Sequence, residues 1–247
     1  MSIHSLYVAS NFTDTMNELP DCLLDARRWN KLLKPFCASS TLLLGKRASR
    51  EGILKAGKKW LERLEPSDLG ILLFSQHGTQ EKINGQPHEA IVCDDLELIY
   101  DFESDDLLSH RAKRTTVAIL GDVCYFGGMP RGFKHNPSKP KTIPLRRCKS
   151  HKAIPPAKMK ALRNAIVYAG ASGLPGDEYS YSTGHGGAMS LAMQQAFGER
   201  GMDATFGWLH RRVTIGKNRL LPSDEAPQHP TITASADNLR RTLKSFT

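Results

Sequence analysis

Two residues able to do nucleophilic chemistry follow apolar runs in the sequence. His77 lies in SQHGTQ, directly after the run DLGILLF, and Cys124 lies in GDVCYFGG, directly after TTVAIL. A cysteine thiolate is a nucleophile, and a neighbouring imidazole can activate it or protonate a leaving amine. The next residue after the histidine, Gly78, lets a substrate approach closely, and the N–H groups of Gly78 and Cys124 are candidates for holding an oxyanion. The alternative is a buried structural cysteine and an unrelated loop histidine.

Alternating strands and helices are expected to position these residues. Apolar runs predict strands at 4–10, 40–45, 69–75, 117–122 and 165–170, and a last short strand within 227–233. Apolar residues at helical spacing predict helices within 22–36, 48–68, 101–113 and 186–200, with Ser49 as an N-cap. This order indicates an open, mostly parallel sheet with helices on both faces. In such sheets a ligand site lies outside the carboxyl ends of the strands, where His77 and Cys124 meet if their strands are neighbours.

Composition and charge narrow the class of protein. The 247 residues suit one larger α/β domain or two small ones, with 40% hydrophobic and 24% charged residues. The net charge of +9 comes mainly from 131–160, which holds ten of the 34 Lys and Arg residues and no Asp or Glu. A nucleic-acid-binding arm is one interpretation of this segment, but no stacking aromatics or binding motif accompany it. Nucleic acid is therefore not the expected partner.

Cysteine usage and the N-terminal residues predict a location. The five cysteines are an odd number, far apart and without a CxxC pair. That pattern favours a reducing compartment over a disulfide framework or a zinc site. The start, MSIHSLYVASNF, lacks a basic region followed by an apolar one, and no apolar run has the length of a membrane span. We therefore expect a cytoplasmic protein without a membrane partner.

Taken in order, several blocks of the sequence resemble the caspase–metacaspase superfamily of cysteine peptidases, peptidase C14. The matching blocks are CLLDARRW (an early "NDA" helix), ILLFSQHGT (a hydrophobic run and "SGHG"), EAIVCDD, VAILGDVCYFGG ("D-x-C-x-S-G") and AIVYAGAS (the small-subunit core). The resemblance covers nearly the whole chain and is nearest to metacaspase-like and bacterial caspase-like members. It implies a three-layer α/β/α fold with a mostly parallel, roughly six-stranded sheet.

The resemblance also implies a role for individual residues. Cys124 would attack the scissile carbonyl, His77 would be the acid and base, and Gly78 would supply an oxyanion-hole amide. In metacaspases the primary specificity pocket is acidic and accepts Arg or Lys, and the matching residues here are Asp25, Ser75 and Asp122. Carboxylates in fixed geometry suit a guanidinium or an ammonium. The alternatives are a solvated helix residue for Asp25 and a strand-end cap for Asp122.

Two departures from the family pattern bear on activity. Phe126 stands where serine is usual, and Gln76 adds bulk beside the histidine. Neither replaces a reacting group, so we expect an active endopeptidase that cleaves protein substrates after Arg or Lys. The competing interpretation is a catalytically silent caspase-like scaffold or regulator.

Calcium is the cofactor that the resemblance raises. Many metacaspases bind calcium through aspartates after the histidine block and one after the cysteine. The residues here able to offer hard oxygen ligands are Asp94, Asp95, Asp105 and Asp106. Arg131 stands at the position after the cysteine and cannot ligate a cation. An acidic solvated face is the alternative, and we expect neither an obligatory calcium ion nor another metal or cofactor.

The basic segment has a second interpretation within a single caspase-like domain. It separates a large-subunit-like part, 1–130, from a small-subunit-like part, 161–247, where many family members are cleaved. An enzyme that prefers basic residues would find Arg146 and Arg147 there, in PLRRCKS. We therefore predict processing in this loop, by the protein itself or by another basic-specific protease, and a monomer rather than a homodimer. A solvated linker without processing is the alternative.

Overall fold

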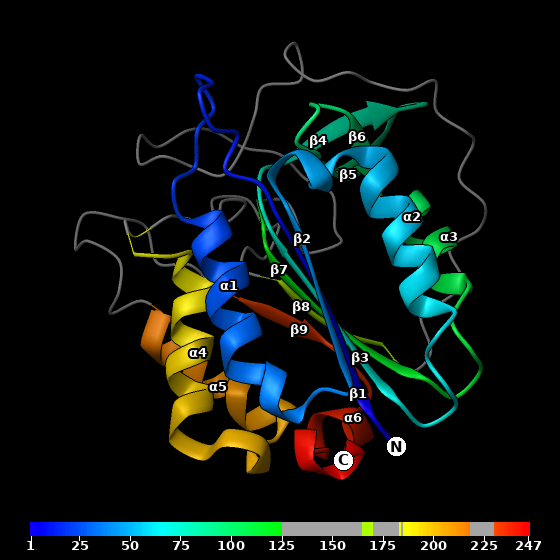
Figure 1. The fold of residues 1–247 in the computed structure, drawn as a ribbon, viewed down its shortest axis with the longest axis vertical. Coiled ribbons are helices and arrows are strands. Elements are labelled where there is room, and N and C mark those ends of the chain that lie inside the picture. The colour runs from blue at the N-terminus through cyan, green and yellow to red at the C-terminus, as the bar shows by residue number, and fades with distance from the viewer. Residues whose placement is uncertain (125–164, 170–182, 184, 218–229) are drawn as a thin grey trace.

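The computed structural model contains the predicted strands and helices in their predicted order, together with elements that the sequence did not predict (Figure 1). The structure describes residues 1–124, 165–169, 183, 185–217 and 230–247. No helix within these ranges is long and apolar enough to cross a membrane.

The main sheet has six strands in the order β2-β1-β3-β7-β8-β9. All neighbours pair in parallel except β8 and β9, which pair antiparallel. The strands are β1 (Ile3–Ala9), β2 (Ser39–Leu44), β3 (Leu69–Ser75), β7 (Thr116–Asp122), β8 (Ala165–Ala169) and β9 (Thr231–Thr233). The predicted mostly parallel, roughly six-stranded sheet is confirmed.

Helices cover both faces of this sheet (Figure 1). The α-helices are α1 (Cys22–Leu33), α2 (Arg50–Leu61), α3 (Asp101–Ser109), α4 (Ala188–Arg200), α5 (Phe206–Lys217) and α6 (Ala236–Arg240). Short 3₁₀ turns are η1 (Lys34–Phe36), η2 (Gly45–Ala48), η4 (Gly201–Asp203) and η5 (Leu243–Phe246). Ser49 caps α2 as predicted, since its side chain accepts a hydrogen bond from the Gly52 N–H. The first helix ends near Pro35 as predicted, with α1 followed directly by η1, because proline lacks the N–H that an α-helix needs.

The three layers follow from strand periodicity. Every residue of β3 is buried, and successive side chains point to opposite faces. Ile71 and Leu73 pack with α1, α4 and α5, whereas Leu72 and Phe74 pack with α2 and α3. β7, likewise buried throughout, lies beside it. A strand that is covered on both faces has apolar residues at every position, and such strands are typical of the predicted three-layer α/β/α fold.

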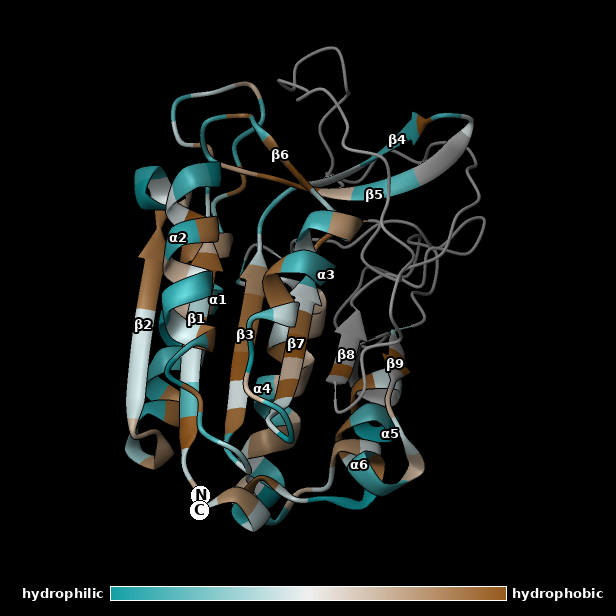
Figure 2. Ribbon diagram, turned by 90° about the vertical axis from the view of Figure 1, so that its right-hand side faces the viewer, coloured by the Kyte–Doolittle hydropathy of each residue, from teal (hydrophilic) through white to brown (hydrophobic). Residues whose placement is uncertain are grey.

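A second sheet extends the chain beyond the carboxyl ends of the main strands (Figure 2). It is antiparallel and consists of β4 (Gly78–Ile83), β5 (Gln86–Val92) and β6 (Leu98–Tyr100). The turn between β4 and β5 is Asn84-Gly85, with φ of 51° and 79°, which suits a tight hairpin. We did not predict this sheet, and it begins directly after His77.

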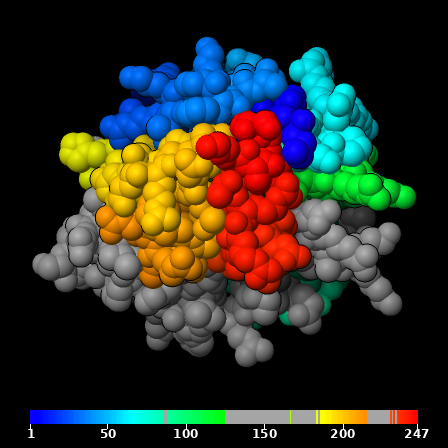
Figure 3. Space-filling view, turned by 90° about the horizontal axis from the view of Figure 1, so that it is seen from below, coloured from blue at the N-terminus to red at the C-terminus, as the bar shows by residue number. Residues whose placement is uncertain are grey.

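The opposite end of the molecule holds both chain termini. Figure 3, seen from below, shows the first residues of β1 beside the C-terminal segment that contains α6 and η5. The Arg241 guanidinium joins this segment to the sheet, donating to the Thr116 hydroxyl at 3.2 Å. The carboxyl end of the sheet is therefore remote from the termini.

Candidate active site

The two candidate reacting residues follow neighbouring strands at the same level. β3 and β7 pair so that Ser75 lies opposite Asp122, and His77 and Cys124 each come two residues later. A Cβ placed on Gly78 would lie only 2.1 Å from the carbonyl oxygen of Cys124. The backbone after the histidine thus touches the backbone at the cysteine. The structure brings His77, Gly78 and Cys124 together at the carboxyl edge of the sheet, as the sequence predicts.

His77 is held in one orientation by its neighbours. Its Nε2 lies 2.6 Å from the carbonyl oxygen of Asn17, and the Phe12 ring packs against the imidazole at a centroid distance of 4.8 Å. A carbonyl oxygen can only accept, so Nε2 carries the hydrogen of this bond. In the neutral imidazole the basic nitrogen is then Nδ1. The main chain is fixed too, because the His77 carbonyl accepts from the Val92 N–H at 3.0 Å.

Asn17 and Phe12 belong to the loop 10–20 between β1 and α1, which sequence reasoning missed. Phe12 is buried with a left-handed φ of 52°, a conformation that a bulky residue rarely adopts. Its ring also packs into the core of the second sheet. A backbone carbonyl carries no sequence signal, because every residue has one, so nothing in the sequence pointed to Asn17.

Two other cysteines that the structure describes have thiols with raised pKa values. Burial and the nearby carboxylate of Asp95 hold the pKa of Cys93 well above its usual value. Burial likewise raises the pKa of the Cys37 thiol. Neither thiol is then a ready nucleophile at neutral pH. Cys124 is likewise buried and without a disulfide, and what distinguishes it is the contact of its main chain with the position of Gly78, next to His77.

The three residues of the predicted basic-specificity pocket also gather at one place. The Ser75 hydroxyl donates to the Asp25 carboxylate at 2.8 Å, and Asp122 lies beside Ser75 on the neighbouring strand. Both aspartates are fully buried. Asp25 is therefore not the solvated helix residue that was the alternative.

The first turn of α4 binds both aspartates. The Gly187 N–H donates to the two carboxylate oxygens of Asp25 at 3.1 and 3.0 Å, and the Ser190 N–H donates to Asp122 at 2.9 Å. The first N–H groups of a helix lack partners within the helix and carry partial positive charge, so they suit buried carboxylates. A Cβ on Gly186 would lie 2.7 Å from Asp25 Oδ1. The GHGG sequence before α4 was the available signal for this end of the helix.

The side chain of Gln76 does not crowd the site. It is fully buried, and its Nε2 donates to the Val92 carbonyl at 3.2 Å. The bulk that departs from the family pattern is thus taken up beneath the second sheet. Phe126, Arg131, Arg146 and Arg147 lie outside the described residues.

The candidate calcium ligands serve local structure. The carboxylate of Asp95 accepts from the Arg50 and Glu97 N–H groups, and Asp94 accepts from the Ser10 hydroxyl. Asp105 and Asp106 lie on α3. No group of three or more His, Cys, Asp or Glu side chains in the described part of the chain is arranged to hold a metal ion.

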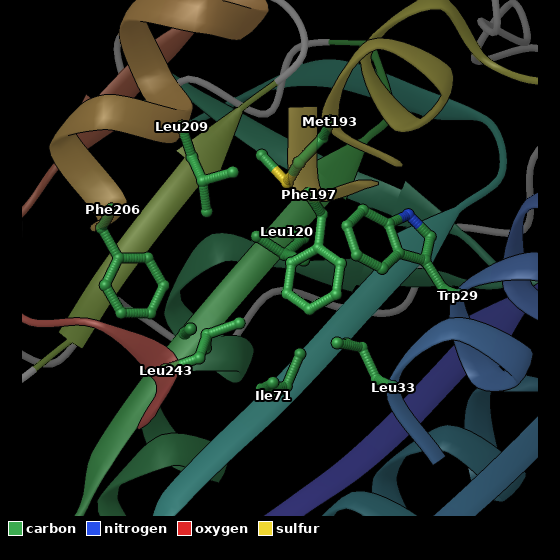
Figure 4. Close-up of a pocket in the computed structure, with 10 residues that line it drawn as sticks. Trp29, Leu33, Ile71, Leu120, Met193, Phe197, Phe206, Leu209 and Leu243 are labelled. Carbon is green, nitrogen blue, oxygen red and sulfur yellow. The ribbon is translucent and has the colours of Figure 1, made fainter. Parts of the chain in front are cut away.

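Figure 4 shows a separate cavity of about 30 Å³ between the main sheet and the helices α1, α4 and α5. Its lining is apolar, including Trp29, Leu120 and Phe197. A cavity of this size without polar groups holds neither a substrate nor an ordered water. It belongs to the core and not to the site.

A three-layer α/β/α fold that brings a cysteine and a histidine together at the carboxyl ends of neighbouring strands is the arrangement of caspase-like proteins. The caspase domain model, peptidase C14, matches residues 6–240, and the chain belongs to this family of cysteine peptidases. The predicted resemblance is confirmed.

Solved structures share the fold. Protein GSU0716 from Geobacter sulfurreducens superposes with a TM-score of 0.73 at 16% identity, over 98% of both chains. Caspase-1 from Spodoptera frugiperda superposes with a TM-score of 0.56 at 13% identity, over 94% of this chain and 86% of that one. No curated protein matches the sequence.

Proposed function

We propose that the protein is a cysteine endopeptidase in which Cys124 is the nucleophile and His77 the acid and base. The contact between Gly78 and the Cys124 backbone carries this proposal, because it fixes the histidine loop against the cysteine loop. The hydrogen bond from His77 Nε2 to the Asn17 carbonyl supports it, since it directs the basic Nδ1 away from that carbonyl. A reducing compartment such as the cytoplasm would keep the thiol available.

The reaction divides into two steps. His77 takes the thiol proton, and the Cys124 sulfur adds to the scissile carbonyl, whose oxygen becomes an anion. The N–H groups of Gly78 and Cys124 are proposed to hold this oxyanion. His77 then protonates the leaving amine as the C–N bond breaks, leaving a thioester on Cys124. Water, deprotonated by His77, releases the carboxylic acid and restores the thiol.

The proposed cleavage after Arg or Lys rests on the two buried carboxylates. Asp25 and Asp122 lie directly below the strand ends that carry the reacting residues, with Ser75 between them. Both accept hydrogen bonds from backbone N–H groups of α4, and their carboxylates suit a cationic substrate side chain. Charge-assisted pairing of this kind is strong when water is excluded.

We further propose activation by cleavage at Arg146 or Arg147 within 131–160, by the protein itself or by another protease. The burial of both reacting side chains, 1% exposed for Cys124 and 3% for His77, supports a requirement for activation. Protein substrates are the expected partners, the protein is proposed to act as a monomer, and no cofactor is needed for this chemistry.

The test uses matched fluorogenic peptides ending in Arg, Lys or Asp, each with calcium and with a chelator. The native chain, Cys124→Ala and the control Cys37→Ala are compared, and intact mass follows processing. We expect release after Arg or Lys that is lost in Cys124→Ala and retained in Cys37→Ala. Absence of Cys124-dependent release from both the intact and the processed chain would overturn the peptidase in favour of a silent scaffold.

A further inference from the structure

The first turn of α4 carries a buried hydroxyl that the reaction described above does not use. Ser190 is fully buried, and its N–H donates to the Asp122 carboxylate at 2.9 Å. Its Oγ is buried as well, yet this oxygen has no hydrogen-bond partner in the described part of the chain. A hydroxyl offers one donor and two acceptor sites, and burying it unpaired costs free energy. A bound group that pairs with this oxygen would therefore gain more than it would from a hydroxyl in water.

Helical spacing turns this hydroxyl toward the sheet beside the proposed specificity pocket. Met193 and Phe197 lie three and seven positions after Ser190 on the same face of α4, and both are buried in the core. Figure 4 shows these two side chains directed toward Leu120 of β7. Asp122 lies two residues beyond Leu120, and alternate residues of a strand share a face. Ser190, one turn before Met193, thus faces the sheet at the level of Asp122.

The second carboxylate of the pocket lies about one helical turn away. Gly187, which donates to Asp25, precedes Ser190 by three positions on α4, a separation of about 5–6 Å. Three acceptors therefore approach one place from α1, β7 and α4, namely the two carboxylates and the Ser190 Oγ. A guanidinium has five N–H donors in a rigid plane, so it can bind a carboxylate with two and still donate to other acceptors. A lysine ammonium is a compact point charge with three donors.

We propose that the Ser190 hydroxyl accepts a hydrogen bond from the guanidinium of an arginine substrate and makes the pocket prefer Arg to Lys. This inference rests on the proposed function and narrows its substrate class from basic residues to arginine. The two carboxylates supply the negative charge that both side chains need. The hydroxyl adds an acceptor that the guanidinium, with its larger number of donors, can use in addition to the carboxylates. Ser190 is then a specificity residue and takes no part in bond breaking.

Kinetics with matched peptides test the preference. Peptides that differ only in having Arg or Lys before the scissile bond are compared on the native chain, Ser190→Ala and Ser5→Ala. Because a hydrogen bond to a charged group is lost, Ser190→Ala should lower kcat/KM for Arg about tenfold, mainly through KM. The loss for Lys should be smaller, so the Arg-to-Lys ratio should fall toward one.

Ser5→Ala is the matched control for these kinetics. Ser5 is also fully buried, but it lies in β1 and its hydroxyl donates to the Ser40 hydroxyl at 3.0 Å. This variant should keep the Arg-to-Lys ratio of the native chain. A ratio that is unchanged in Ser190→Ala would overturn the inference while leaving the peptidase intact.

Binding to an inactive chain separates this inference from the proposed function. The affinities of peptides ending in Arg, Lys or citrulline, the neutral analogue of arginine, are measured for Cys124→Ala by fluorescence anisotropy, with the chain intact and cut within 131–160. Arg should bind more tightly than the other two, and adding Ser190→Ala should weaken it about tenfold, even if the native chain shows no turnover. Equal or absent binding of Arg and citrulline would overturn the acidic pocket and this inference with it. Tighter binding of Arg that Ser190→Ala leaves unchanged would overturn the hydroxyl contact alone.

The stability of the unbound protein gives a third readout. Ser190→Ala removes an unpaired buried hydroxyl, so it should raise the urea concentration at the midpoint of unfolding. Ser5→Ala removes a paired hydroxyl and should lower this midpoint. A lower midpoint in Ser190→Ala would mean that its hydroxyl is already bonded within the unbound protein, and would overturn the inference.

Discussion

The main chain at Gly78 lies so close to Cys124 that no side chain fits between them. A Cβ would meet the Cys124 carbonyl oxygen at 2.1 Å and the Val123 Cγ1 at 2.6 Å. Backbone atoms cannot yield as the end of a flexible side chain can, so any larger residue must push the two loops apart. The distance between the histidine and cysteine loops thus depends on this one glycine.

Gly78→Ala is therefore expected to separate the two reacting residues. Displacement by about 1 Å costs on the order of 100-fold in rate, so kcat should fall at least that far. Gly198→Ala is the matched control, because nothing lies within 4 Å of its added Cβ on the exposed face of α4. That control should keep full activity and gain about 0.5–1 kcal/mol of stability. Equal activity of the two variants in a peptidase assay would contradict the close contact.

Asp25 and Asp122 should affect both substrate selection and stability. Asp25→Asn or Asp122→Asn removes a charge that α4 binds, so each should lower the free energy of unfolding by about 1 kcal/mol. Each should also lower kcat/KM for Arg peptides more than tenfold, mainly through KM, since loss of a charge-assisted bond is large. Urea unfolding and peptide kinetics measure the two effects, with Asp237→Asn on α6 as the control. A normal KM would remove these residues from the specificity pocket.

At the scale of elements, α3 contains a carboxylate in an unfavourable place. Burial, and then the charge of Asp101, raise the pKa of Asp105 above its ordinary value, and its Oδ2 is buried without a hydrogen-bond partner. A raised folded-state pKa means that the charged form is less stable in the folded protein than in the unfolded chain. The contribution of Asp105 to the stability of the folded protein is therefore most favourable below pH 3.8, the ordinary pKa of this carboxyl group, and it is lost as the pH rises through the raised pKa.

Asp105→Asn should consequently stabilise the protein near neutral pH. Solvent screens this half-exposed group, so the gain should be about 0.5 kcal/mol. The gain should vanish as the pH falls through the raised pKa of Asp105 toward 3.8, because the native carboxyl becomes neutral there. Thermal melts across pH measure it, with Asp106→Asn, an exposed neighbour on the same helix, as the control. A gain that does not depend on pH would contradict the electrostatic cause.

Sequence periodicity predicted the elements whose residues share one clear burial pattern. β3 and β7 are covered by helices on both faces, so their sequences are continuous apolar runs. α2 packs on the sheet with one face only, so its apolar residues form a single stripe. The second sheet was missed, although Asn84-Gly85 is a strong hairpin signal, because its first strand GTQEKI is mostly polar. The segment WLHRRVTI, left without a predicted element, lies in α5.

The sequence pointed to the side chains of the candidate site but not to its backbone groups. His77, Cys124, Asp25 and Asp122 could be proposed as candidates because the chemistry of their side chains is specific to their residue type. The carbonyl of Asn17 and the N–H groups of Gly187 and Ser190 could not, since backbone groups are common to every residue. Their position depends on long-range packing, with α4 more than 160 positions beyond Asp25 in the chain.

At the scale of the whole molecule, one sheet joins the two parts of the sequence on either side of the basic segment. β8 pairs in parallel with β7, and the first turn of α4 binds Asp25 and Asp122. The core on that face mixes residues of α1 with those of α4 and α5. The two parts are held together by these sheet, helix and core contacts and not by the chain connection across 131–160.

Cleavage within 131–160 should therefore leave the two pieces associated. A recognition sequence for an unrelated protease is substituted into this segment, the protein is cut, and gel filtration follows the products. Both pieces should elute together at the volume of the uncut monomer and separate only in denaturant. Separation in native buffer would contradict the shared sheet and core, and elution at twice the mass would contradict the predicted monomer.

The attachment of both aspartates to α4 limits how this protein can evolve or be engineered. Replacing Asp25 or Asp122 by an uncharged or basic residue would remove the carboxylate that accepts from the first N–H groups of α4. Any change at either position would therefore need a compensating change in the first turn of α4.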